Sequence, residues 1–127
     1  MNLQAMMDGI SAQMQRDRAN TQLTLGKLIA ALEDMPEGAE VANLTNMHSY
    51  RGYYEDLAFE KEGGVRQAVD LLAECKAAMG QVFHGYKGGE YVMGALTPVW
   101  VAIYGCSGQR LMALYSGGGI QTETEDQ

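Results

Sequence analysis

The chain has 127 residues, which is enough for one domain with a core of its own. Its 9 basic and 16 acidic side chains give a net charge of −7, which argues against binding to polymeric nucleic acid or to an anionic membrane, since both partners need clustered basic groups. Because no apolar run approaches the ~20 residues of a membrane-spanning helix, and the start lacks the pattern of a secretion signal, we expect a cytoplasmic protein.

Residues 1–22 are predicted to form a methionine-rich amphipathic helix ahead of the domain. Its apolar positions recur at helical spacing: Leu3, Met6, Met7, Ile10 and Met14. Methionine side chains adapt to imprecise partners, so this stripe packs either on its own domain or on a second subunit. The sequence leaves both arrangements open.

Two more helices are predicted within a single domain of residues 23–116. The first spans 24–35, where Thr24 caps the helix and Pro36 stops it. Its apolar positions are Leu25, Leu28, Ile29, Leu32 and Met35. The second spans about 65–79 and ends at Gly80. Its expected apolar side is Val65, Ala68, Val69, Leu72, Cys75 and Met79.

Period-two patterns and turn residues mark the strands, which we expect at 40–44, 53–60, 91–93, 98–104 and 109–116. Residues 53–60 alternate like a half-exposed strand, whereas 98–104 is apolar on both faces like a central one, with Trp100 in the core. Residues 117–127 are predicted to be a disordered acidic tail. The fold class is therefore α+β, with two or three helices packed on a small antiparallel or mixed sheet of four to five strands. So small a core favours a homo-oligomer.

Catalytic and metal-binding patterns are weak. Cys106, with His48 or His84 as a base, would make a nucleophile pair, but a cysteine in a glycine-rich turn is more typical of a structural residue. Cys75 and Cys106 are too few for a disulfide framework, and no metal-ligand spacing occurs, so we expect reduced thiols and no cofactor. The acidic pairs 33–34 and 55–56 are interpreted as solvated charge.

Two stretches combine the residue types of a nucleotide site: His-Ser-Tyr-Arg-Gly-Tyr-Tyr at 48–54 and His-Gly-Tyr-Lys-Gly-Gly-Glu-Tyr at 84–91. Tyrosine rings stack on bases, Arg and Lys bind phosphate, and glycine amides cradle anions. We therefore expect Arg51 and Lys87 to contact phosphate. The other expected contacts are stacking by Tyr50, Tyr54, Tyr86 and Tyr91, hydrogen bonds from His48 and His84, and an anion nest at Gly88 and Gly89. Alternatively, these tyrosines complete the rim of the core and the glycines only make turns.

Four segments resemble a family of small proteins encoded by tailed bacteriophages: residues 24–32, 48–54, 85–89 and 104–106. The resemblance covers roughly residues 24–115. Because the family carries no settled activity, the resemblance implies only a phage source and a location in the host-cell cytoplasm. In general character the chain is similar to phage anti-defence sponges, which bind nucleotide signals without cleaving them. The expected function is therefore non-enzymatic sequestration of a small anionic nucleotide signal of host immunity. The alternative is an inhibitor that binds a host defence enzyme directly, through the methionine stripe.

Overall fold

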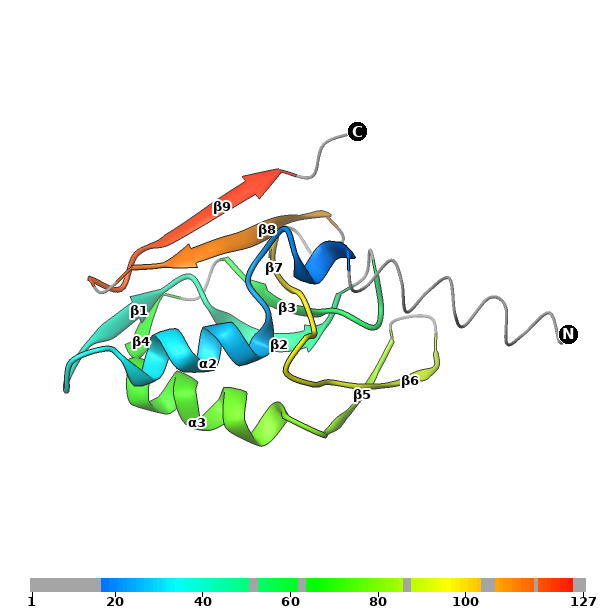
Figure 1. The fold of residues 1–127 in the computed structure, drawn as a ribbon, viewed down its shortest axis with the longest axis horizontal. Helices are drawn as coiled ribbons and strands as arrows, with labels where there is room; N and C mark the ends of the chain where they lie inside the picture. The colour runs from blue at the N-terminus through cyan, green and yellow to red at the C-terminus, as the bar shows by residue number, and fades with distance from the viewer. Residues whose placement is uncertain are drawn as a thin grey trace, which may run out of the picture.

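The computed structural model describes residues 17–50, 53–61, 64–85, 88–103, 107–115 and 117–124. These residues form an α+β fold in which helices pack against a five-stranded sheet (Figure 1). The helices are α2 (Leu25–Glu33) and α3 (Ala68–Ala78), and residues 17–19 are also helical. The predicted fold class is confirmed. None of the helices in the described ranges is long and apolar enough to cross a membrane.

The strands make one mixed sheet and two short ribbons. In chain order they are β1 (Glu40–Ala42), β2 (Thr45–Ser49), β3 (Leu57–Glu60), β4 (Val65–Gln67), β5 (Val82–His84), β6 (Glu90–Val92), β7 (Val99–Ile103), β8 (Ser107–Leu114) and β9 (Ile120–Thr124). The sheet order is β2-β3-β7-β8-β9, in which β3 and β7 are parallel and the other neighbours antiparallel. The ribbons are β1-β4 and β5-β6, both antiparallel.

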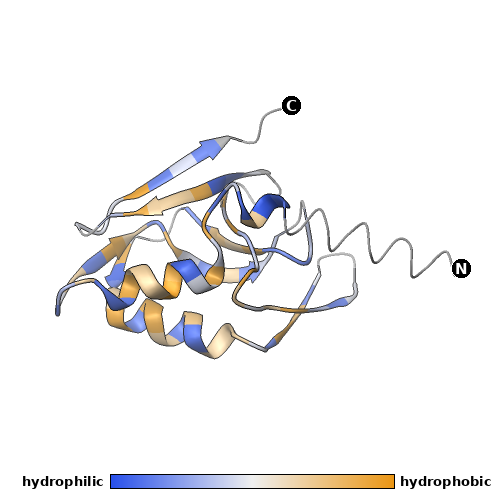
Figure 2. Ribbon diagram, in the orientation of Figure 1, coloured by the Kyte–Doolittle hydropathy of each residue, from blue (hydrophilic) through white to orange (hydrophobic). Residues whose placement is uncertain are grey.

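Helix α2 follows its sequence pattern closely. The Thr24 hydroxyl accepts a hydrogen bond from the Lys27 backbone N–H at 3.3 Å, which confirms the predicted cap. Leu25, Leu28 and Leu32 are buried on one side of the helix. Figure 2 shows the resulting alternation of apolar and polar residues along α2 and α3. Periodicity and capping therefore predicted this helix correctly.

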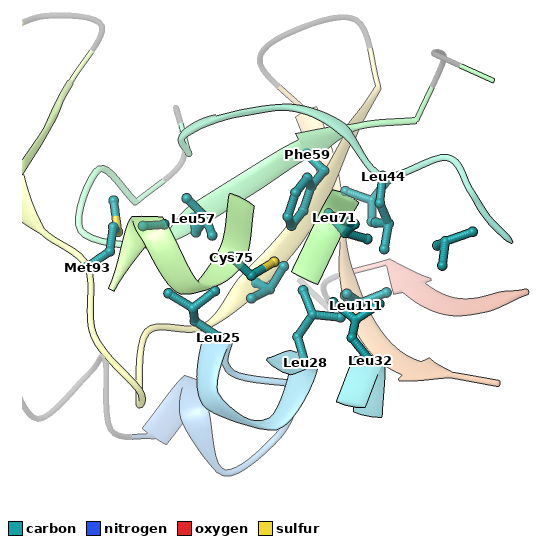
Figure 3. Packing of buried hydrophobic residues seen from close by; sticks show 14 of the residues in the cluster. Leu25, Leu28, Leu32, Leu44, Leu57, Phe59, Leu71, Cys75, Met93 and Leu111 are labelled. Carbon is teal, nitrogen blue, oxygen red and sulfur yellow. The ribbon is translucent and has the colours of Figure 1, made fainter. Parts of the chain in front are cut away.

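The main core lies between the two helices and one face of the sheet (Figure 3). The parallel register pairs Leu57 with Val99 and Phe59 with Val101, so all four side chains share the helix-covered face. Helix α3 contributes Leu71 and Cys75, and β8 contributes Leu111. Burial of these apolar side chains is the main source of stability for a domain of this size.

The opposite face of the sheet is also covered. Ala58, Trp100 and Ala102 alternate with the main-core residues along β3 and β7, and Tyr50 and Tyr53 pack over them. Of the core strand predicted at 98–104, strand β7 confirms 99–103, with Trp100 buried, and Tyr104 lies outside the described residues. The prediction of a half-exposed strand at 53–60 is wrong, because the face expected to meet solvent lies beneath these two tyrosines.

Helix α3 begins later, and is rotated relative to its prediction. Val65–Gln67 forms strand β4 on β1, and the helix starts only at Ala68. Its buried side is Ala68, Leu71, Cys75 and Ala78, while Val69 is 67% exposed. Pairing with β1 sets where the helix starts, and periodicity within the helix alone does not reveal that constraint. Gly80 has φ +80°, as predicted for a residue that ends a helix.

The prediction of a disordered tail is wrong for residues 117–124. Strand β9 pairs with β8, and the Tyr115 N–H donates to the Gly119 carbonyl across a turn in which Gly118 has positive φ. Polar composition misled the prediction, because an edge strand needs only one covered face and backbone hydrogen bonds. Residues 125–127 lie outside the described residues, as do residues 1–16 with the methionine stripe.

The N-terminal segment joins the domain earlier than the predicted boundary at residue 22. Ala19 and Gln22 are buried, and the Gln22 side-chain amide donates to the Val99 carbonyl at 2.7 Å. The backbone of Leu23 hydrogen-bonds to Val99 and to Leu111. Residues 17–22 are therefore part of the domain's packing.

Ile120→Ala should destabilise the protein by about 1–3 kcal/mol, because Ile120 packs against the main core from β9. Chemical denaturation of wild type and variant measures the loss. Gln121→Ala, at an exposed position on the same strand, serves as the control and should change stability by less than about 0.5 kcal/mol. Equal stabilities for Ile120→Ala and Gln121→Ala would mean that β9 does not pack in solution.

Candidate functional site

The structure brings together one tyrosine from each predicted stretch. Tyr54 lies in the turn between β2 and β3, and Tyr91 lies on β6. Their ring centroids are 6.0 Å apart, with the ring planes tilted by 34°. Both side chains are partly exposed. The two stretches therefore meet where the β5-β6 ribbon contacts the β2-β3 turn.

Glycines at the end of the ribbon allow this approach. A Cβ on Gly85 would lie 3.1 Å from the Tyr54 ring and 3.0 Å from the Tyr91 ring, so a larger residue would push the two tyrosines apart. Gly88 and Gly89 have φ of +101° and +89°. The expected anion nest needs correction, because the Gly88 N–H donates to the Gly85 carbonyl at 3.0 Å and is used within the turn.

An open groove of about 540 Å³ lies beside strand β5 of the ribbon. It runs between β2, the C-terminal half of α3 and β5, and its lining residues include Asn46, Met47, Gln81 and Phe83. Phe83 lies directly opposite Tyr91 in the ribbon register. Directly opposed residues share one face of an antiparallel pair, so Tyr91 lies on the same face of the ribbon as Phe83, one of the residues that line the groove.

The two histidines are not part of this tyrosine pair. His48 lies on β2, and its Nδ1 is 2.6 Å from the Asn46 carbonyl oxygen, so this ring nitrogen donates within the chain. His84 is exposed and opposite Glu90, one position along from the Phe83–Tyr91 pair. Because successive side chains of a strand point to opposite faces, His84 faces away from Tyr91. His84 is therefore separate from the tyrosine pair, and its contact with a ligand stays a prediction.

The expected stacking role of Tyr50 is wrong. Tyr50 is only 4% exposed and stacks on Trp100, with centroids 4.5 Å apart and planes at 13°. A Cβ on Gly108 would come within 2.8 Å of the Tyr50 ring, so the β8 backbone also packs tightly on it. For this tyrosine, the alternative interpretation as a core residue is correct. Arg51, Tyr86 and Lys87 lie outside the described residues.

A buried ion pair between Arg18 and Asp56, not expected from the sequence, lies at the turn that carries Tyr54. Asp56, interpreted as solvated charge, is completely buried. The Arg18 Nε donates to Asp56 Oδ2 at 2.7 Å and Nη2 donates to Oδ1 at 3.1 Å, while the Trp100 indole N–H donates to Oδ2 at 2.9 Å. A bidentate guanidinium–carboxylate pair is the strongest geometry available to these two groups. Its one sequence cue is that Asp56 directly precedes a buried strand.

Arg18 makes two further contacts from the same guanidinium. Its Nη2 lies 2.8 Å from Glu55 Oε1, and its Cζ lies 3.9 Å from the centroid of the Tyr53 ring, a cation–π contact. Burial raises the pKa of Asp56, and the hydrogen bonds from Arg18 and Trp100 offset only part of that rise. For Arg18, burial lowers the pKa, but the contacts with Asp56 and Glu55 raise it above its ordinary value.

Nucleophilic and metal chemistry find no support in the described part of the chain. Cys75 is a free, buried thiol, and burial raises its pKa to about 12, which keeps it protonated and unreactive at neutral pH. Within those ranges, no three His, Cys, Asp or Glu side chains gather closely enough to hold a metal ion. Cys106, the other candidate nucleophile, lies outside them.

Comparison with known proteins assigns neither a family nor a fold relative. A scan against protein-family models, a search of curated proteins and a search of solved structures each found no match to the chain. The resemblance to small tailed-phage proteins therefore stays a prediction.

Arg18→Met should make the stability of the protein strongly dependent on pH. The variant leaves the buried Asp56 carboxyl with Trp100 as its remaining donor among these contacts, so the pKa of Asp56 rises further. A folded-state pKa above the unfolded value means that stability is lost as the pH rises through the folded pKa. We expect a loss of about 3–5 kcal/mol near neutral pH and a smaller loss below about pH 4, where Asp56 is protonated in both states.

Urea unfolding over a pH series measures this effect. Lys61→Met, at an exposed lysine, is the matched control, and its stability curve should run parallel to that of wild type. A loss in Arg18→Met that is the same at every pH would contradict the assignment of Asp56 as the uncompensated group.

Proposed function

We propose that this protein is a phage-encoded, non-enzymatic binder that sequesters a small anionic nucleotide signal of host immunity. The observation that carries the proposal is the contact between Tyr54 and Tyr91 beside the groove. Two aromatic side chains from distant parts of the chain lie together, and Tyr91 is opposite Phe83, which lines the groove. Base stacking on such rings contributes ~1–3 kcal/mol per base and suits a planar ligand.

The groove has the size and chemistry for the nucleobase part of such a ligand. Its volume of about 540 Å³ falls within the range of roughly 300–1,000 Å³ typical of small-molecule sites. The amide side chains of Asn46 and Gln81 can hydrogen-bond the edge of a base, and Met47 and Phe83 offer apolar surface to its face. Glu74, the acidic residue of the lining, is paired with Arg66 at 3.2 Å, which reduces repulsion of an anion.

The phosphate part of the proposal depends on Arg51 and Lys87. Lys87 precedes Gly88 in the chain, and the flanking Gly85 lies against both tyrosine rings. Because Lys87 lies between these two glycines in the sequence, we propose that its ammonium group contacts a phosphate attached to a base that stacks on the tyrosine pair. Arg provides a planar fork for phosphate oxygens, and Lys provides a point charge.

The first test is native mass spectrometry of the protein purified from cells with an active nucleotide-signalling defence. It reports both the number of subunits, which we propose to be more than one, and any ligand that is retained. A bound mass that matches a dinucleotide or cyclic nucleotide would support the proposal. Protein that stays empty when challenged with a nucleotide panel would overturn it.

Arg51→Ala combined with Lys87→Ala should abolish binding of the retained nucleotide, because both phosphate contacts are lost. Calorimetric titration measures the affinity, and the melting temperature should stay close to that of wild type. Lys27→Ala combined with Lys61→Ala removes the same charge at two exposed lysines outside both stretches, and should leave binding intact. If the first double variant unfolds instead, the two cations are structural and the site is wrongly assigned.

A second candidate function, direct inhibition of a host defence enzyme, is favoured by an apolar surface on the ribbon. Val92 is 64% exposed on the face away from Tyr91, where Val82 lies opposite it. Exposed apolar pairs on a small ribbon suit contact with another protein. The methionine stripe of residues 3–14, on which this alternative first rested, lies outside the described residues.

Val92→Glu separates the two candidates, because Val92, unlike its neighbour Val82, does not line the groove. If the protein docks on an enzyme through the ribbon, the variant should no longer protect a phage from the host defence, although its affinity for nucleotide is unchanged. If the protein sequesters a nucleotide, Val92→Glu should retain both properties. Val65→Glu, at a valine that is 60% exposed on β4, is the control for an added surface charge.

A further inference from the structure

The contacts of Arg18 bracket Tyr54, one of the two aromatic residues of the proposed site. Tyr53 and Glu55, which precede and follow Tyr54, both contact the Arg18 guanidinium. Asp56, the next residue, accepts two hydrogen bonds from the same group. We infer that Arg18 is a positioning residue, which holds this turn in the conformation that presents Tyr54 to Tyr91. The inference builds on the proposed function, since it names what keeps that site assembled.

Tyr54 faces away from the group that positions it. Its ring lies against Tyr91 and next to Gly85, on the side of the β5-β6 ribbon. The side chains of its neighbours Tyr53 and Glu55 meet Arg18 instead. Arg18 therefore acts on Tyr54 through the backbone, by fixing the residues on both sides of it.

The backbone bonds of the turn do not replace these side-chain contacts. The Tyr50 N–H donates to the Asp56 carbonyl, the Asp56 N–H donates to the Tyr53 carbonyl, and the Ser49 hydroxyl donates to the Tyr54 carbonyl. Without Arg18, however, the buried Asp56 carboxylate would lose two hydrogen bonds and the positive charge that provides them, while Glu55 stays beside it in the chain. Removing a charged partner from a buried carboxylate is strongly unfavourable, so the turn would shift to bring Asp56 to water.

This arrangement couples the N-terminal segment to the proposed binding surface. Arg18 belongs to the helical residues 17–19, and it is 37 positions from Glu55 along the chain. Any event that withdraws residues 17–19 from the domain removes the contacts by which Arg18 holds the turn. Ligand affinity then falls although no residue that contacts ligand has changed.

The test compares wild type with Arg18→Met by nuclear Overhauser contacts between the rings of Tyr54 and Tyr91. We expect the variant to lose these contacts and to keep those between Phe59 and Val101 in the sheet. With cyclic di-AMP as the probe, we expect its affinity to fall roughly tenfold, the loss of one stacked ring. If wild type does not bind the probe, that result bears on the proposed function alone, and the ring contacts still decide the role of Arg18.

Two further variants keep the test decisive. Leu32→Ala removes a core side chain of α2 away from the turn, and should lower stability while preserving the ring contacts and the affinity of the folded protein. Glu55→Gln weakens the contact between Arg18 and residue 55 and keeps the Arg18–Asp56 pair. This variant should therefore show a smaller loss of ring contacts and affinity, and it can be measured even if Arg18→Met does not fold. Wild-type ring contacts in both Arg18→Met and Glu55→Gln, or their equal loss in Leu32→Ala, would overturn the inference.

Discussion

The buried carboxylate of Asp56 is the constraint on which much of this structure depends. It lies directly before β3 with no solvent exposure, where an unpaired charge would be strongly unfavourable. The guanidinium of Arg18 and the indole N–H of Trp100 satisfy it. Because these donors come from the N-terminal segment and from a central strand, one acidic group ties together three distant parts of the chain.

Coverage of both faces of the sheet follows from the same arrangement. The helices close one face over the main core, and Tyr50 and Tyr53 close the other over Trp100. Arg18 in turn stacks on Tyr53, so a cation–π contact covers the outer side of this second layer. The turn that carries these tyrosines is therefore built into the core on one side, and it presents Tyr54 to the β5-β6 ribbon on the other.

The sequence predicted which stretches contribute to the candidate site, but it did not predict which of their side chains are exposed there. Composition singled out residues 48–54 and 84–91, and one tyrosine from each stretch, Tyr54 and Tyr91, meets the other in the fold. It did not distinguish Tyr54 from Tyr50, although Tyr54 is partly exposed against Tyr91 and Tyr50 is buried in the core. Both are tyrosines next to cations and glycines in the sequence, and only the path of the chain across the sheet decides which ring meets solvent.

What the sequence determined by itself were features set by local physics. The α2 helix follows from its cap and its apolar spacing, β7 from a run that is apolar on both faces, and the end of α3 from a glycine. Tertiary structure alone decided the buried face of α3, the pairing of β9 and the burial of Asp56. These depend on strand registers and on a charge partner 38 residues away. Contacts over such separations leave no periodic signal in a single sequence.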